Sequence, residues 1–109
     1  MSHKEHLKIS KIIGEIIVFF LNRGIHDLKL HVTKTETADR ITIDVKEINP
    51  IHEAEFVKKM NQHREQEIET YGWSLLGESG IELAGLFIDS VEVIKDDQGV
   101  HFVLERILQ

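Results

Sequence analysis

Residues 28–46 read LKLHVTKTETADRITIDVK, and this stretch decides the fold class. In each of its two halves apolar and polar residues alternate, which is typical of a β-strand with one buried face. The polar segment 34–40 predicts a turn that joins the two strands. The alternating apolar positions are Leu28, Leu30 and Val32 in the first half and Ile41, Ile43 and Val45 in the second.

The segment before these strands has a different period. Its apolar residues recur at helical spacing, which predicts a helix over residues 4–22. Asn22 and Gly24 supply the stop, because glycine is favoured just past a helix end. The positions that define this period are Ile9, Ile12, Ile13, Ile16, Ile17 and Phe20.

Two further helices are predicted after the strands. Asn49 precedes Pro50 at the first helical position, so a charged helix begins there and runs to about Thr70. The pattern from Ser79 to Glu82 resembles a capping box that opens a helix through about Ile88. The predicted apolar stripe of the first of these helices consists of Ala54, Val57, Asn61, Arg64 and Ile68.

The chain closes with a predicted hairpin of two strands, over residues 91–94 and 100–104, around the turn 95–99. The element order is therefore α-β-β-α-α-β-β. This order predicts an α+β fold, a two-layer sandwich with helices packed on a mixed or antiparallel four-stranded sheet. We expect one domain over residues 1–109.

Composition narrows the class of function. The 109 residues carry 19 acidic and 13 basic side chains, a formal net charge of −6, which argues against nucleic-acid binding. The longest apolar run, residues 16–21, is far below the ~20 residues that cross a bilayer, and no signal peptide is recognised, so we expect no membrane partner. The chain has no cysteine, which fits a cytoplasmic location.

Motifs that carry chemistry are sparse. His52, His63 and Glu67 have helical spacings that could place metal ligands on one helix, but no tight zinc-binding motif accompanies them, and surface or core histidines explain them better. No nucleophile motif and no standard phosphate loop occur. Gly80 opens a predicted helix whose amino terminus could attract an anion, although a role in helix punctuation explains it more simply.

In this order, the elements resemble a shortened ATP-binding domain of the histidine kinase, gyrase and heat-shock chaperone ATPase superfamily (GHKL), and are most similar to its small anti-sigma-factor kinases. The first helix of that family carries Glu-x-x-x-Asn, whose amide binds the magnesium of the nucleotide. Here the matching stretch runs from Glu15 to Phe19, so the glutamate is retained and Phe19 replaces the asparagine that binds the metal.

Two other family motifs are also altered. In that family, a strand leads into Asp-x-Gly-x-Gly, whose aspartate binds the adenine amine. Here Glu47 occupies the position of the aspartate, and Asn49 and Ile51 occupy the positions of the two glycines. Gly80 corresponds to one glycine of the phosphate-binding loop, whereas Glu78 falls where another would lie. The closing segment 80–108 is the best match, similar to the last helix and hairpin of these kinases.

The resemblance implies a vestigial nucleotide pocket at Glu15, Phe19, Glu47, Asn49 and Gly80. With the magnesium ligand lost, ATP turnover is not expected. The sequence therefore predicts a non-catalytic regulatory or protein-interaction module, without metal or cofactor, that forms a homodimer or binds a sigma-like partner. Its candidate contacts are the helix from His52 to Thr70 and the exposed sheet edge. The alternative is a nucleotide-binding anti-sigma-type serine kinase, with ATP and magnesium, or a small-anion sensor; the direction of Phe19 discriminates between the two.

Overall fold

The computed structural model describes residues 3–61 and 80–108. It confirms the predicted α+β fold and its element order. The elements are α1 (His3–Asn22), β1 (Leu28–Lys34), β2 (Ala38–Val45), α2 (Pro50–Met60), α4 (Ile81–Leu86), β3 (Ser90–Asp96) and β4 (Gly99–Ile107).

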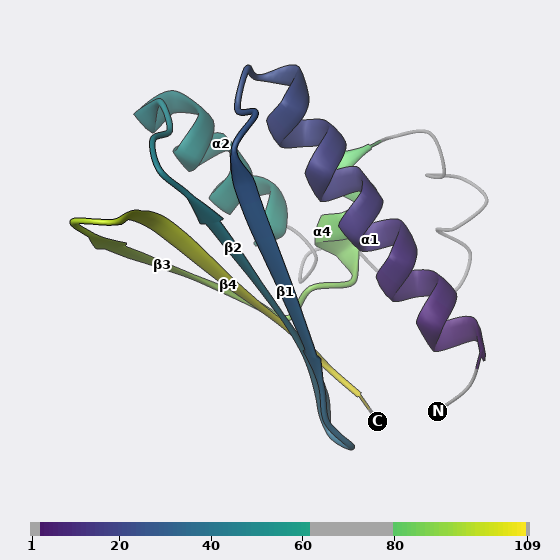
Figure 1. Ribbon diagram of the computed structural model, residues 1–109. Coiled ribbons are helices and arrows are strands. Elements are labelled where there is room, and N and C mark those ends of the chain that lie inside the picture. The colour runs from purple at the N-terminus through teal and green to yellow at the C-terminus, as the bar shows by residue number, and fades with distance from the viewer. Residues whose placement is uncertain (1–2, 62–79, 109) are drawn as a thin grey trace.

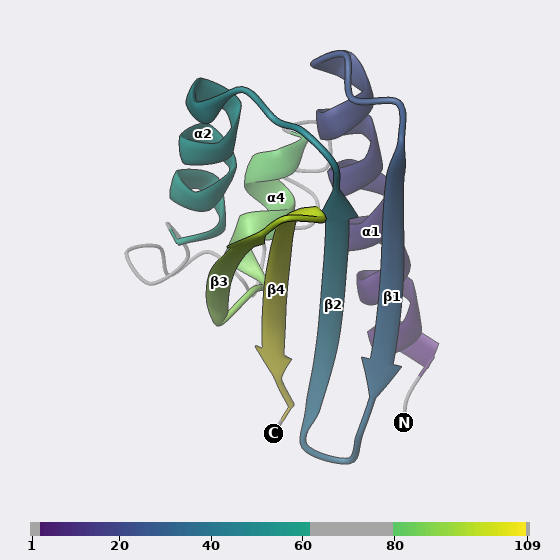
Figure 2. The ribbon, with the colours of Figure 1, turned by 60° about the vertical axis from the view of Figure 1, so that its left-hand side comes forward.

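The four strands form one sheet in the order β1-β2-β4-β3, and all three neighbouring pairs are antiparallel. The sheet is thus antiparallel rather than mixed. The central pairing of β2 with β4 joins the two hairpins, and it places Ile41 opposite Leu104 and Ile43 opposite Phe102. The described helices cover one face of this sheet, with α4 between α1 and α2, and no described element covers the other face (Figures 1 and 2).

The core lies between the helices and the covered sheet face. Phe20 of α1, Phe56 of α2 and Phe102 of β4 are fully buried and meet there. The ring centroids of Phe20 and Phe56 are 4.9 Å apart, and those of Phe56 and Phe102 are 5.0 Å apart. Because buried aromatic rings contribute large apolar areas, this cluster fixes both helices to the sheet.

Helix α2 begins as the sequence predicts, but it buries a different face. The Asn49 side chain accepts a hydrogen bond from the backbone N–H of Ile51 at 2.9 Å, which caps the helix. The buried residues are Phe56 and Met60, whereas Ala54 of the predicted stripe is exposed.

Val57 of the predicted stripe is partly buried and packs against the core, whereas Asn61 is exposed, so among the described positions the prediction holds for Val57 alone. The large Phe56 ring packs into the aromatic cluster and sets the rotation of the helix. The helix ends at Met60, with Asn61 as its C-cap residue, before the predicted end near Thr70. The predicted stripe positions Arg64 and Ile68 lie outside the described residues.

Helix α4 is shorter than predicted and packs closely on α2. Gly80 is its N-cap residue, with a φ of 68° that favours glycine, so the helix begins there; Ser79 lies outside the described residues. The helix ends at Leu86, two residues before the predicted Ile88. A Cβ atom on Gly85 would come within 2.0 Å of the Lys59 carbonyl oxygen, so glycine permits the contact between the two helices.

Candidate functional site

An open cleft with a volume of about 660 Å³ lies where the end of α1, the loop after β2 and the start of α2 meet. The cleft is lined by positively charged, negatively charged and apolar side chains. Its lining includes Arg23, Ile25, Glu47, Asn49, His52 and Val100.

Two of the predicted nucleotide-site residues line this cleft. Glu47 and Asn49 both belong to the loop between β2 and α2 and are exposed. The Asn49 side-chain oxygen is already engaged in capping α2, so its loop position is held by the helix that follows. Glu47 and Asn49 thus lie together at the cleft, beside Arg23 and His52.

Phe19 lies in the core next to the cleft rather than in the cleft. Its side chain is 3% exposed, and its ring centroid lies 5.3 Å from that of Phe20 and 5.5 Å from that of Phe56. The Arg23 guanidinium covers the ring, with its central carbon 3.6 Å from the ring centroid. This distance is within the range of a cation–π contact. Phe19 thus points into the core and is enclosed by aromatic rings and a guanidinium group.

Arg23 also joins the end of α1 to α2. Its Nε and Nη2 atoms donate to the two carboxylate oxygens of Glu55 at 2.9 and 2.8 Å, and Nη1 donates to the Phe19 carbonyl oxygen at 3.1 Å. The hydrogen bonds from Arg23 lower the pKa of Glu55, and the same bonds raise the pKa of Arg23. Such a bidentate pair is directional as well as electrostatic. It joins the end of α1 to the middle of α2 beside the Phe19 ring.

Glu15 and Gly80 lie together, but neither lines the cleft. A Cβ atom on Gly80 would be 3.8 Å from Oε1 of Glu15. Oε2 of Glu15 pairs with Lys11 Nζ at 3.3 Å. A carboxylate beside the start of α4 opposes the binding of an anion there, because like charges repel. The structure therefore divides the predicted site residues into a cleft-lining pair, a core residue and this second pair.

The histidine positions form no metal centre in the described part of the chain. Residues 3–61 and 80–108 contain no group of three or more histidine or carboxylate side chains that could hold a metal ion. His52 Nδ1 lies 3.7 Å from Glu55 Oε1, beside the Arg23 pair. His63 and Glu67 lie outside the described residues.

None of the described helices is long and apolar enough to cross a membrane.

Sequence reasoning did not identify Arg23 and Glu55 as a linked pair. Arg23 follows the predicted helix end, and Glu55 is one of several charges on α2. The two residues are 32 positions apart. No local pattern joins them, because the contact depends on where the two helices pack on the sheet.

Compared with protein-family models, curated proteins and solved structures, the chain has no significant match.

Proposed function

We propose that this chain is a non-catalytic regulatory module that acts through protein–protein contacts, with a degenerate GHKL-type, anti-sigma-factor-like fold and a cytoplasmic location. The observation that carries the proposal is the buried Phe19 ring beneath the Arg23 guanidinium. In the family that the sequence resembles, an amide at this position binds the magnesium of the nucleotide. A phenyl ring offers no ligand atom to a hard cation, which prefers oxygen.

The closed contact between α1 and α2 supports the same proposal. Arg23, just after α1, donates two hydrogen bonds to Glu55 in the middle of α2, so its guanidinium is engaged by a protein carboxylate rather than offered to phosphate. Glu15 stands beside Gly80, where the resemblance would place phosphate. Because phosphoryl transfer depends on positioned cations, these residues are poorly suited to it. The partner proposed for the module is a second copy of the chain or a sigma-like regulator.

The cleft favours one second candidate, a sensor that binds a nucleotide or another small anion without turnover. Its volume of about 660 Å³ lies in the range of small-molecule sites. Arg23 and His52 are its cationic or protonatable members, and Glu47 is its acidic member. This candidate requires a ligand that competes with Glu55 for Arg23.

Calorimetric titration of the chelator-treated full chain with ADP and ATP, each with and without magnesium, tests the proposal. We expect no saturable heat at millimolar nucleotide. Saturable, magnesium-dependent binding would overturn the proposal and favour the kinase alternative. Binding without magnesium that is weakened by Glu47→Gln and unchanged by Glu36→Gln, a matched substitution outside the cleft, would favour the sensor instead.

A further inference from the structure

The outward face of α1 carries an apolar stripe that no described element covers. Leu7, Val18 and Leu21 are 56%, 50% and 42% exposed. Since each residue turns an α-helix by about 100°, these positions share one face of α1. Exposed apolar side chains gathered on one face of a helix commonly mark an interaction site. Between residues 7 and 21 the stripe contains no charged residue; its members are Leu7, Ser10, Gly14, Ile17, Val18 and Leu21.

Gly14 lies at the centre of this stripe, and no contact within the described part of the chain requires a glycine there. It is exposed in the middle of a 20-residue helix, where glycine costs about 1 kcal/mol relative to alanine. A Cβ atom at Gly14 would meet nothing within 4 Å. A second backbone that approaches α1 at this point would account for the glycine, because only glycine leaves room for the closest helix contact.

The stripe is complementary to its own inverted copy. Leu7 and Leu21 are equally far from Gly14 along the helix, and Ser10 and Val18 are also placed symmetrically. A two-fold axis through Gly14 that pairs two α1 helices in antiparallel fashion sets Leu7 of one copy against Leu21 of the other. Ser10 then meets Val18, and Gly14 meets Gly14. Such a contact uses the same surface on both copies, as two-fold dimers require.

The charges that border the stripe fit the same arrangement. Lys11 and Glu15 lie on one side of it and pair within the chain at 3.3 Å. The two-fold axis brings Lys11 of one copy within about 3 Å, along the helix axis, of Glu15 of the other copy on that same side. Opposite charges therefore border the contact from both copies, as they do beside the seam of coiled coils.

We propose that the α1 stripe binds a second copy of this chain through antiparallel, two-fold packing centred on Gly14. The inference rests on the proposed role as a protein-interaction module and adds its partner. Among the helices of residues 3–61 and 80–108, only α4 flanks α1 (Figure 2), and the apolar members Leu7, Val18 and Leu21 of the stripe are exposed. Nucleotide titration does not measure this contact. Nucleotide binding would therefore overturn the proposed non-catalytic function without testing the dimer, and a monomeric chain would overturn the dimer without testing nucleotide binding.

Sedimentation equilibrium of the full chain over a range of concentrations tests the contact. We expect a mass that rises from 12.6 kDa toward twice that value. Leu21→Lys should weaken dimerisation about a hundredfold or more, since the two-fold axis repeats the loss in both copies. Ile51→Lys on α2 is the matched control, because Ile51 is also apolar and is 74% exposed. A mass that stays at that of one chain, or an equal effect of both substitutions, would overturn the proposal.

Disulfide crosslinking tests the geometry and does not depend on a destabilising change. The chain has no cysteine, so Leu7→Cys and Leu21→Cys introduce the only thiols. A mixture of the two variants should crosslink on oxidation, whereas Leu7→Cys alone should not. In the antiparallel pair the two copies of position 7 are about 21 Å apart along the axis, beyond the reach of a disulfide. Crosslinking of Leu7→Cys alone at the rate of the mixture, or no crosslinking of the mixture, would contradict the arrangement.

Discussion

His101 of β4 lies opposite Asp44 of β2, with its Nδ1 atom 2.6 Å from Oδ1 of Asp44. Its Nε2 atom lies 3.0 Å from Oδ1 of Asp96 at the end of β3. The histidine thus links three strands on the open face of the sheet. The bonds to Asp44 and then to Asp96 raise the pKa of His101, and the hydrogen bond with His101 lowers the pKa of Asp96.

These pKa shifts predict how stability depends on pH. A raised pKa of His101 in the folded state adds stability below its ordinary value of 6.5, and this stability is lost as the pH rises through the folded value. The lowered pKa of Asp96 adds stability above its ordinary value of 3.8, which is lost as the pH falls through the folded value. We therefore expect the cluster to contribute most between these two values.

Urea denaturation from about pH 5 to pH 9 measures this dependence. The unfolding free energy of the natural chain should fall above pH 6.5 relative to that of His101→Gln, so that the two curves converge. His31→Gln, an exposed histidine on β1, is the control and should keep the dependence of the natural chain. Curves that stay parallel for the natural chain and His101→Gln would refute the role of His101.

Arg106→Met should be destabilising. Arg106 is 7% exposed on the covered face of the sheet, where it donates to the Phe87 carbonyl oxygen at 3.0 Å and to Glu5 at 3.1 Å. The buried Asp39 is its partner in the strand register. The Glu5 side chain is 24% exposed and Asp39 also pairs with Lys34, so the main loss is the hydrogen bond to the buried Phe87 carbonyl oxygen. An unsatisfied buried acceptor of this kind costs about 1–3 kcal/mol.

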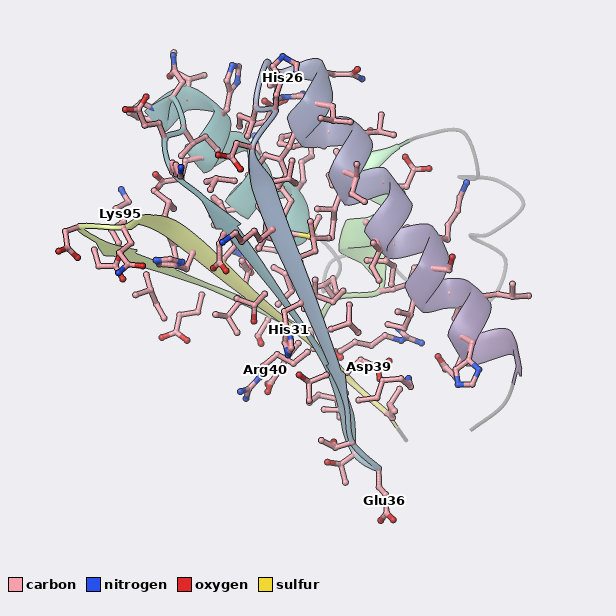
Figure 3. The ribbon with its side chains drawn as sticks, in the orientation of Figure 1. His26, His31, Glu36, Asp39, Arg40 and Lys95 are labelled. Atoms are coloured by element: carbon pink, nitrogen blue, oxygen red, sulfur yellow. The ribbon has the colours of Figure 1, made fainter. Side chains whose placement is uncertain are left out.

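Arg40→Met is the matched control for Arg106→Met, because Arg40 follows Asp39 on β2 and projects from the opposite face of the sheet (Figure 3). It pairs with Glu105 at 2.9 Å in an exposed position, so its loss should cost about 0–1 kcal/mol. Chemical denaturation at pH 7 compares the two variants. Equal losses would show that burial does not govern the effect.

Gly85→Ala should destabilise the contact between α4 and α2. The added methyl group would overlap the Lys59 carbonyl oxygen, which belongs to the backbone and cannot rotate away. Overpacking of this kind costs about 1–3 kcal/mol, in spite of the higher helix propensity of alanine. Thermal denaturation measures the loss. Glu82→Ala, an exposed substitution in the same helix, should stay within about 0.5 kcal/mol, and a stabilised Gly85→Ala variant would disprove the close approach.

A double-mutant cycle with Arg23→Ala and Glu55→Ala should give a favourable coupling of about 0.5–1 kcal/mol at neutral pH, as expected for a partly exposed ion pair. The lowered pKa of Glu55 means that this coupling is present above the ordinary value of 4.5 and is lost as the pH falls through the folded value. Urea denaturation of the four chains at neutral and acidic pH measures it. A coupling that does not weaken in acid would argue against an ionic contact.

The candidate site was only partly predictable from sequence. Glu47 and Asn49 could be placed at one loop because the strand before them and the helix after them have strong local signals. Their neighbour in the cleft, Arg23, directly follows α1, which precedes both strands, and its partner Glu55 is 32 positions further along the chain. Side chains so far apart meet only after the helices have packed.

Local signals in the sequence specified the elements of this protein: the alternation in residues 28–46 specified two strands with one buried face, and Asn49 with Pro50 specified where α2 begins. These signals are local, since backbone geometry sets the period of a strand and the capping of a helix. Three further features depend on long-range packing: β2 pairs with β4, α2 buries Phe56 and Met60, and Phe19 lies beneath Arg23. Those outcomes depend on how side chains distant in the chain fill one shared core, and no local period specifies that packing.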